Sequence, residues 1–369
     1  MSRPSNKVTL AGVATSSMIA TPLFAQRGTS KPKATKWRAA ATGLALLACI
    51  SAACSSGAPS NKTPTAIPAA DPAGTGRYGV GTTTMTFTRQ TADGPRALKT
   101  LFWYPTGAAP DAAPQADAPP ARGHFPIVIL SHGLKVEPQL FQYLTQHLAS
   151  WGFVVAAPGH NPGNTSADCP VFPCDQAAWF ASLGARQEDV PFVLAQIVAL
   201  KDDPSQRLGD IIDARRTAIV GDSLGGVFAI SKANSFGAAI FLAPAPWGPN
   251  DRSNAGSVRV PTLIIGGGKD TLATVGDLDA FYAALPPDIA KTYVTLAEGH
   301  HLSFLDSCDI PFLAVTTAFC PEALLPLARG HELINHYVTA FFETQLVGDA
   351  RYAHFLSESE LPDAQVAAR

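Results

Sequence analysis

The segment Gly-Asp-Ser-Leu-Gly at residues 221–225 has the residue types and the spacing that nucleophilic catalysis needs. An apolar run, 217–220, precedes it, and a helix-like stretch follows. A strand, a G-x-S-x-G segment and a helix together form a turn so tight that its flanking positions accept only small residues, and the serine hydroxyl is exposed above the sheet. The same segment without these flanks is often an ordinary glycine-rich loop. The flanks therefore favour Ser223 as a catalytic nucleophile.

A serine hydroxyl is a weak nucleophile at neutral pH and needs a base within hydrogen-bond reach. After such an elbow, an orienting acid and then a histidine follow along the chain. Asp270 comes just past the apolar run 262–265 and is the expected acid, although an aspartate there could also cap a helix. His300 and His301 follow the next apolar run, and one of them is the expected base. This chemistry needs no metal and no organic cofactor.

These groups can meet only if the strands that carry them end at one edge of a sheet. Short apolar runs alternate with stretches of helical periodicity. Strands are expected at 83–89, 98–104, 125–130, 153–157, 217–220, 238–242, 262–265 and 293–296, and helices at 137–150, 189–200, 275–285 and 331–344. The alternation predicts an α/β fold with a mostly parallel central sheet flanked by helices, and an antiparallel hairpin at its edge. Ligands bind at the carboxyl ends of such strands.

Seven segments of the domain resemble the α/β-hydrolase superfamily, and within it the serine esterases similar to platelet-activating-factor acetylhydrolase and dienelactone hydrolase. They are FWYP (102–105), LSHGL (130–134), HNPGNTSAD (160–168), RQEDVPFVL (186–194), GDSLGG (221–226), PTLIIGGGKD (261–270) and GHHLSF (299–304). In that family the catalytic histidine is followed by one residue and then Ser-Phe, so the resemblance implies His301 as the base rather than His300. The sequence departs from the family at Asp222, where histidine is common.

Stabilising the reaction's oxyanion requires two hydrogen-bond donors that are already in place. The elbow geometry assigns one donor to the amide of Leu224, and the resemblance implies the amide of Leu134 as the other. His132, just before, is expected to brace that loop. His160 and Trp247 follow strand ends and are candidates to contact substrate; a structural role for His160 and core packing for Trp247 are the alternatives.

The composition excludes several other classes of protein. Hydrophobic residues make up 46% and charged residues 15%, which is enough for a large core and excludes wholesale disorder. The 27 basic and 29 acidic residues leave a net charge of -2, which gives no electrostatic reason to expect a nucleic-acid partner. The expected partner is a small-molecule, lipid or polymer ester.

The N-terminal region, residues 1–54, has the pattern of an export signal. A basic patch at 31–38 is followed by an apolar run at 39–50 and then by small residues around Cys54. This resembles a bacterial lipobox with Cys54 as the lipidated residue; Cys49 is a second possibility, and cleavage near Ala53 without lipidation is a third. Residues 55–76 are typical of a flexible linker, so the hydrolase domain is expected at 77–369. The protein is therefore expected to be exported, either anchored to a bacterial membrane or free in the periplasm or medium.

Four further cysteines fit an oxidising compartment. They are Cys169, Cys174, Cys308 and Cys320. Their even number indicates two disulfides, for which three pairings exist; the pairing of sequence neighbours is the simplest. A metal site is the rival interpretation, but the spacing is not C-x-x-C and no histidine stands at ligand spacing beside these cysteines.

These observations predict an exported serine hydrolase that cleaves carboxylic esters through an acyl-enzyme. A polyester-type or a phospholipid-type hydrolase is an alternative within this chemistry. A dienelactone hydrolase is disfavoured because those enzymes commonly use a cysteine nucleophile. An alternative of another class is a catalytically silent surface lipoprotein that uses the fold as a binding module.

Overall fold

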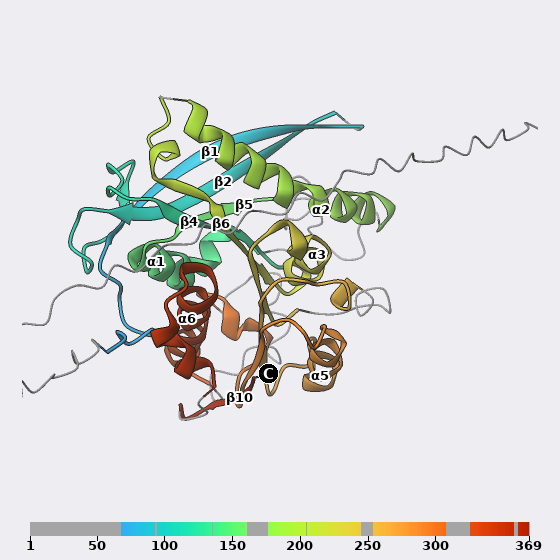
Figure 1. The fold of residues 1–369 in the computed structure, drawn as a ribbon. Coiled ribbons are helices and arrows are strands. Elements are labelled where there is room, and N and C mark those ends of the chain that lie inside the picture. The colour runs from blue at the N-terminus through green and yellow to red at the C-terminus, as the bar shows by residue number, and fades with distance from the viewer. Residues whose placement is uncertain are drawn as a thin grey trace, which may run out of the picture. The chain divides into compact units, whose positions relative to one another are not determined.

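A twisted sheet runs through the centre of the domain, with its strands in the order β10-β9-β8-β7-β6-β4-β5-β2-β1-β3 (Figure 1). The computed structural model describes residues 68–92, 94–134, 136–160, 176–203, 205–244, 254–307, 325–357 and 361–368, with only the backbone described at 176–183. The unit from Thr65 to Arg369 is compact by itself.

The middle of this sheet is parallel, as the sequence predicts. Its six parallel strands are β5 (Val154–Pro158), β4 (Phe125–Ser131), β6 (Ile212–Asp222), β7 (Ala238–Leu242), β8 (Thr262–Gly267) and β9 (Lys291–Leu296). Every residue of β4 and β7 is buried, because helices cover both faces of the sheet. The carboxyl ends of these strands share one edge, which is where the candidate residues follow.

Antiparallel strands complete both sides of the sheet. The long hairpin of β1 (Gly79–Thr91) and β2 (Gly94–Thr106) pairs with β5 through β2, and the two-residue β3 (Gln115–Ala116) lies outside it. On the other side β10 (Ala364–Ala368) pairs with β9. The hairpin was predicted, whereas β10 was not, because its sequence AQVAA is too short and too weakly apolar to stand out.

Helices cover the sheet on its two faces (Figure 1). The helices α1 (Gln142–Trp151) and α6 (Leu327–Phe342) contact each other on one face, and α2 (Gln176–Ala199) and α3 (Leu224–Lys232) contact each other on the opposite face, where α5 (Val275–Ala284) also lies. The apolar positions that repeat along α6, including Ile334, Tyr337 and Phe341, are buried as their spacing predicts.

The helix α2 begins well before the expected start at residue 189. A proline is typical of the first turn of a helix, so Pro191 would fit a helix that begins near Asp189. In the structure the helix runs through Pro191, and both Arg186 and Asp189 are buried side chains of its interior. Tertiary contacts of these two side chains thus outweigh the local signal of the proline. Within the described ranges, none of the helices combines the length and the apolar character that a membrane crossing requires.

Candidate active site

Ser223 stands alone between a strand and a helix, since β6 ends at Asp222 and α3 begins at Leu224. Its backbone has φ 49° and ψ -118°, a strained conformation for a residue with a side chain. Close packing makes this turn possible: a Cβ on Gly221 would lie 2.6 Å from the Cα of Gly226, and one on Gly225 would collide with the carbonyl oxygens of Ser131 and His132. The glycines of the G-x-S-x-G segment are therefore required by backbone contacts, and the serine is presented at the tip of the turn.

The structure brings Ser223, His301 and Asp270 together in one hydrogen-bonded chain. The Ser223 Oγ lies 2.9 Å from the His301 Nε2, and the His301 Nδ1 lies 2.8 Å from the Asp270 Oδ2. The other carboxylate oxygen, Oδ1 of Asp270, accepts the amides of Leu272 and Ala273 at 2.8 and 2.9 Å. Asp270 is thus fixed by its own turn, and it orients the imidazole toward the serine. The cap of α5 is Thr274, not Asp270.

The charges around His301 favour its protonated form. Burial lowers the pKa of His301, but the hydrogen bond and the negative charge of Asp270, together with the charge of Asp222, outweigh this effect and hold the pKa above its usual value. Such an imidazole can take the serine proton and remain stable as the imidazolium.

Asp222, directly before the nucleophile, is a buried carboxyl group. Burial raises its pKa to about 7, against the lowering effects of His301, of the Gly133 amide that hydrogen-bonds to it and of Arg186. This residue, at which the sequence departs from the resembled family, is thus not a surface substitution. It belongs to the electrostatics of the site.

The two predicted oxyanion donors belong to segments that adjoin the nucleophile. Leu224 is the first residue of α3, where a backbone amide has no partner within the helix. Leu134 belongs to the loop that follows β4, and a Cβ on the preceding Gly133 would lie 3.2 Å from the Cβ of Ser223. The loop therefore passes close to the serine at Gly133, directly before Leu134.

The side chain of His160 is buried in a hydrogen-bonded network and is not exposed to a pocket. It is 1% exposed, its Nε2 lies 3.1 Å from the Ser131 Oγ, and its Nδ1 lies 3.1 Å from the Asp189 Oδ2. Both ring nitrogens are engaged and solvent is excluded, so a substrate contact through His160 is not what this arrangement offers. Of the two roles considered for His160, this arrangement fits the structural one.

Other predicted residues fall where the structure gives no description. Trp247, Cys54, Cys169, Cys174, Cys308 and Cys320 all lie outside the described residues. Across the described ranges, no group of three or more His, Cys, Asp or Glu side chains is placed to hold a metal ion.

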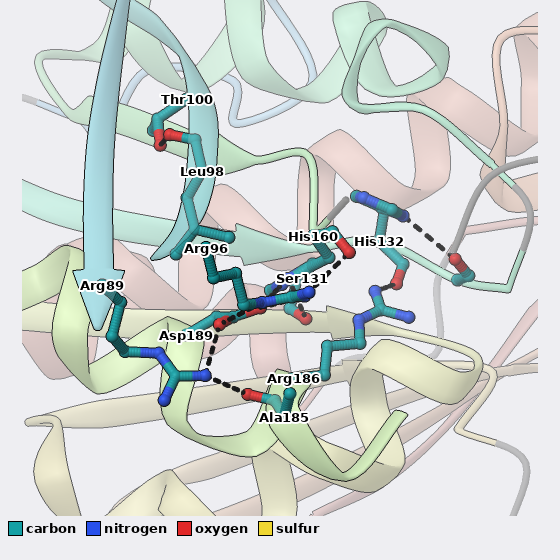
Figure 2. A network of polar contacts seen from close by, with 11 residues as sticks. Arg89, Arg96, Leu98, Thr100, Ser131, His132, His160, Ala185, Arg186 and Asp189 are labelled. Atoms are coloured by element: carbon teal, nitrogen blue, oxygen red, sulfur yellow. Dashed lines mark hydrogen bonds and ion pairs between the residues drawn. The ribbon is translucent and has the colours of Figure 1, made fainter. Parts of the chain in front are cut away.

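Sequence reasoning missed the buried polar residues around Ser131. Arg186 and Asp189 extend from α2, and Arg96 extends from β2, into the space beneath the loop that follows β4 (Figure 2). The signal was present in the segment RQED at 186–189, which belongs to the resemblance. An arginine and an aspartate three residues apart lie on one face of a helix, and this face could have been read as a buried polar one.

Comparisons with known proteins agree with this geometry. Residues 73–368 match the family described as PET hydrolase-like. Cutinase 2 of Thermobifida cellulosilytica is 30% identical over 233 residues, which are 62% of this chain and 71% of that protein. Cutinase cut1 of Thermobifida fusca is also 30% identical over 233 residues, and the match spans 59% of its length.

The fold, the order of the site residues along the chain and these matches lead to one conclusion. This chain belongs to the PET hydrolase-like family, and it is a carboxylic ester hydrolase.

Proposed function

We propose that the protein is an exported serine hydrolase in which Ser223, His301 and Asp270 cleave carboxylic esters through an acyl-enzyme. The observation that carries this proposal is the hydrogen-bonded chain from Ser223 Oγ to His301 Nε2 at 2.9 Å and from His301 Nδ1 to Asp270 Oδ2 at 2.8 Å. The strained backbone at Ser223 supports the same assignment, because strain of this kind persists where function requires it.

The reaction follows from the positions of these groups. His301 takes the proton of Ser223 as the Oγ attacks the ester carbonyl carbon, and Asp270 stabilises the imidazolium that results. The amides of Leu134 and Leu224 hold the oxyanion. The tetrahedral intermediate collapses as His301 gives its proton to the leaving alcohol. Water, activated by the same histidine, then attacks the acyl-enzyme and releases the carboxylic acid.

The substrate class is proposed from the comparisons. The names cutinase and PET hydrolase-like favour a polyester over a small soluble ester. A phospholipid-type substrate is the alternative that fits the narrower resemblance to platelet-activating-factor acetylhydrolase. These possibilities separate when the same enzyme preparation is assayed on polyester film, on p-nitrophenyl esters of rising chain length and on a short-chain phospholipid. Soluble products from the film support the polyester proposal, and turnover of the phospholipid alone contradicts it.

The test of the mechanism is reaction with a fluorophosphonate probe. A nucleophilic Ser223 should gain the probe mass on its own peptide, and the Ser223→Ala variant should not react. Absence of labelling, with the protein folded, would instead favour a silent binding module.

Export and anchoring are a separate proposal. Lipidation of Cys54 would attach the mature chain by acyl chains, and two or more such chains give stable membrane association. Residues 55–76 would then act as a tether for the hydrolase domain. Replacing Cys54 with Ser should move activity from the membrane fraction to the soluble fraction without changing turnover of a soluble ester. A wild-type protein found wholly soluble, with its N-terminus beyond residue 54, would contradict lipidation at Cys54.

The four cysteines of the domain are proposed to form two disulfides. Thiol titration of the denatured, exported protein should find no free thiol among Cys169, Cys174, Cys308 and Cys320. Peptide mapping without reduction should then identify the pairing. Two or more reactive thiols would contradict both this proposal and the oxidising compartment on which it depends.

A further inference from the structure

The loop 132–134, which carries the proposed oxyanion donor Leu134, is held by two buried side chains of opposite charge. On one side, the Nη2 of Arg186 donates a hydrogen bond to the carbonyl oxygen of His132. On the other side, the amide of Gly133 hydrogen-bonds to the carboxyl group of Asp222. The contact is close, because a Cβ on Gly133 would lie 2.6 Å from the Asp222 Oδ2. The carbonyl and the amide of adjacent residues are thus each bound by a different side chain.

Arg186 can hold this position because the helix that carries it is anchored one turn further along. The carboxylate of Asp189 accepts Arg96 at 2.7 Å and Arg89 at 3.0 Å, both from the hairpin, and Arg89 also donates to the carbonyl of Ala185 at 2.9 Å (Figure 2). These bonds join α2 to the β1–β2 hairpin on both sides of Arg186 in sequence. The guanidinium of Arg186 therefore extends to the loop from a helix whose position is fixed.

Both ionisable groups that bind the loop, Arg186 and Asp222, are buried. Arg186 is 1% exposed and Asp222 is 4% exposed, and isolated charges at such positions are expensive. Burial lowers the pKa of Arg186 to about 9 while the charges of Asp189 and Asp222 raise it. The charge of Arg186 is thus compensated by two carboxyl groups. Asp189 lies on the same helix, and Asp222 binds the loop. Replacing Arg186 or Asp222 by a neutral residue would leave the other charged group buried without one of its compensating charges.

We propose that Arg186 and Asp222 are positioning residues that hold the 132–134 loop from its two sides and so keep the Leu134 amide directed at the reacting carbonyl oxygen. This inference rests on the proposed function, in which Leu134 is an oxyanion donor. Neither residue is required to touch the substrate. Their effect is on the direction of one amide, and a displacement of about 1 Å at such a donor can cost about 100-fold in rate.

The same pair explains the departure of the sequence at residue 222. The resembled family commonly has histidine there, whereas this chain has a carboxyl group beside a buried arginine. The groups that face Asp222 are His301 after β9, Asp270 after β8, Arg186 of α2, Gly133 of the loop and Tyr143 of α1. Among them Arg186 is the one that also bonds to the loop, so the acid and the arginine act on the same short segment.

The experiment compares Arg186→Met, Arg186→Lys and Asp222→Asn in the full mature chain, with Arg89→Met as the matched control. Arg89 also anchors α2, but the pair of Arg96 with Asp189 remains when Arg89 is removed, and among the described residues the Arg89 side chain hydrogen-bonds to Asp189 and Ala185 rather than to the loop. Each variant is assayed for kcat and KM on p-nitrophenyl butyrate. Two inhibitors are also titrated: a trifluoromethyl ketone, whose adduct with Ser223 carries an oxyanion, and the corresponding simple alcohol, which cannot form one.

Arg186→Met should lower kcat by about 10- to 100-fold with KM changed less than about 3-fold. It should weaken the ketone by a similar factor and leave binding of the alcohol unchanged. Arg186→Lys, which keeps the charge and one donor, should recover part of the loss. Asp222→Asn should show a smaller loss of the same kind, and the double variant should lose less than the product of the two single losses, because both residues hold one loop. Arg89→Met should keep the ratio of ketone to alcohol affinity.

Three outcomes would overturn the inference. These are unchanged ketone affinity in Arg186→Met, multiplicative losses in the double variant, or an equal loss of ketone affinity in Arg89→Met. If Arg186→Met does not fold, Arg186→Lys and Asp222→Asn carry the same measurements. Fluorophosphonate labelling of Ser223 separates this inference from the proposed function: if wild-type Ser223 is not labelled, the proposed function fails, whereas a labelled serine with insensitive Arg186 variants overturns only the inference.

Discussion

Among the described residues of the domain, two Ser-His-Asp chains have similar geometry, and one of these two is arranged as a catalytic triad. In the first, the two hydrogen bonds are 2.9 and 2.8 Å long; in the second, both are 3.1 Å long. The first chain consists of Ser223, His301 and Asp270, and the second of Ser131, His160 and Asp189. Residue types and distances alone would not tell them apart.

The two chains differ in access to solvent and in the electrostatics of the histidine. Ser223 and His301 are each 9% exposed, whereas Ser131 is fully buried. Asp270, together with Asp222, holds the pKa of His301 above its usual value. For His160, burial and the charges of Arg186 and Arg96 lower the pKa to about 4, although the hydrogen bond and the charge of Asp189 raise it. An imidazole that resists protonation is a weak general base near neutral pH.

The backbone separates the two serines as well. Ser223 is held on a strained turn at the start of α3, beside amides that can bind an oxyanion. Ser131 is the last residue of β4 and is paired in the sheet with Gly221. The comparison shows that a triad depends on a histidine that can be protonated and on a presented serine, and that the same three residue types can also serve as a buried structural network.

The largest expected difference is between the two serines. Ser223→Ala should lower kcat by about 10³- to 10⁶-fold with the fold intact, whereas Ser131→Ala should change kcat by less than about 10-fold. His301→Ala and His300→Ala form a second matched pair, of which only the first should abolish activity. Hydrolysis of a p-nitrophenyl ester, with thermal unfolding as the control for folding, measures all four variants. An active His301→Ala beside an inactive His300→Ala would show that the base is His300.

The two aspartates should separate activity from stability. Asp270→Asn should lower kcat by about 10³- to 10⁴-fold with little change in stability, because the imidazole loses its orientation and its counter-charge. Asp189→Asn should instead lower the free energy of unfolding by about 3 to 5 kcal/mol, because two arginines lose a charged partner, one of them buried. Denaturant unfolding and steady-state kinetics of both variants test this pair. A stable Asp189→Asn protein would contradict the structural role of the second chain.

The sequence predicts one of these two chains and not the other, for physical reasons. Ser223, Asp270 and the adjacent histidines each follow an apolar run, and parallel strands bring such positions to one edge of the sheet. Asp189 lies inside a helix, where its spacing from Arg186 was the local signal, and Arg96 lies inside a strand, where nothing local marks a polar side chain as buried. The parallel strands were predictable for the same reason as the triad, whereas the start of α2 and the strand β10 depend on tertiary contacts.

The pH dependence of activity should report His301, together with Asp222 whose pKa of about 7 lies in the same range, and not His160. His301 must be neutral to accept the serine proton, and its pKa lies above the usual 6.5, so kcat/KM should fall with decreasing pH and reach half its plateau above pH 6.5. Asp270→Asn and Asp222→Asn each remove a negative charge that favours the imidazolium, so the midpoint should move to lower pH in both variants. A midpoint that moves upward would contradict the electrostatic assignment.

The smallest expected effect concerns the stability that His160 gives to the fold. Its pKa is about 4 in the folded protein and about 6.5 in the unfolded chain, so between these values the unfolded chain binds more protons. The stability that neutral His160 contributes is therefore fully present above pH 6.5 and is lost as the pH falls toward 4. By pH 5 this loss amounts to about 2 kcal/mol.

The variant His160→Asn isolates this contribution. Asparagine tolerates the positive φ of 48° at this position, and its amide nitrogen can take the place of Nδ1 toward Asp189. The variant should be less stable than the wild type at pH 7, and the gap should narrow by about 2 kcal/mol at pH 5, because only the wild type loses the histidine contribution. Other titrating groups cancel in this difference, since both proteins carry them. Ser131→Ala keeps His160 and removes its hydroxyl partner, so its gap to the wild type should stay nearly constant over the same range. Urea unfolding at pH 7, 6 and 5 compares the three proteins, and a constant gap for His160→Asn would mean that His160 is protonated as readily in the folded domain as in the unfolded chain.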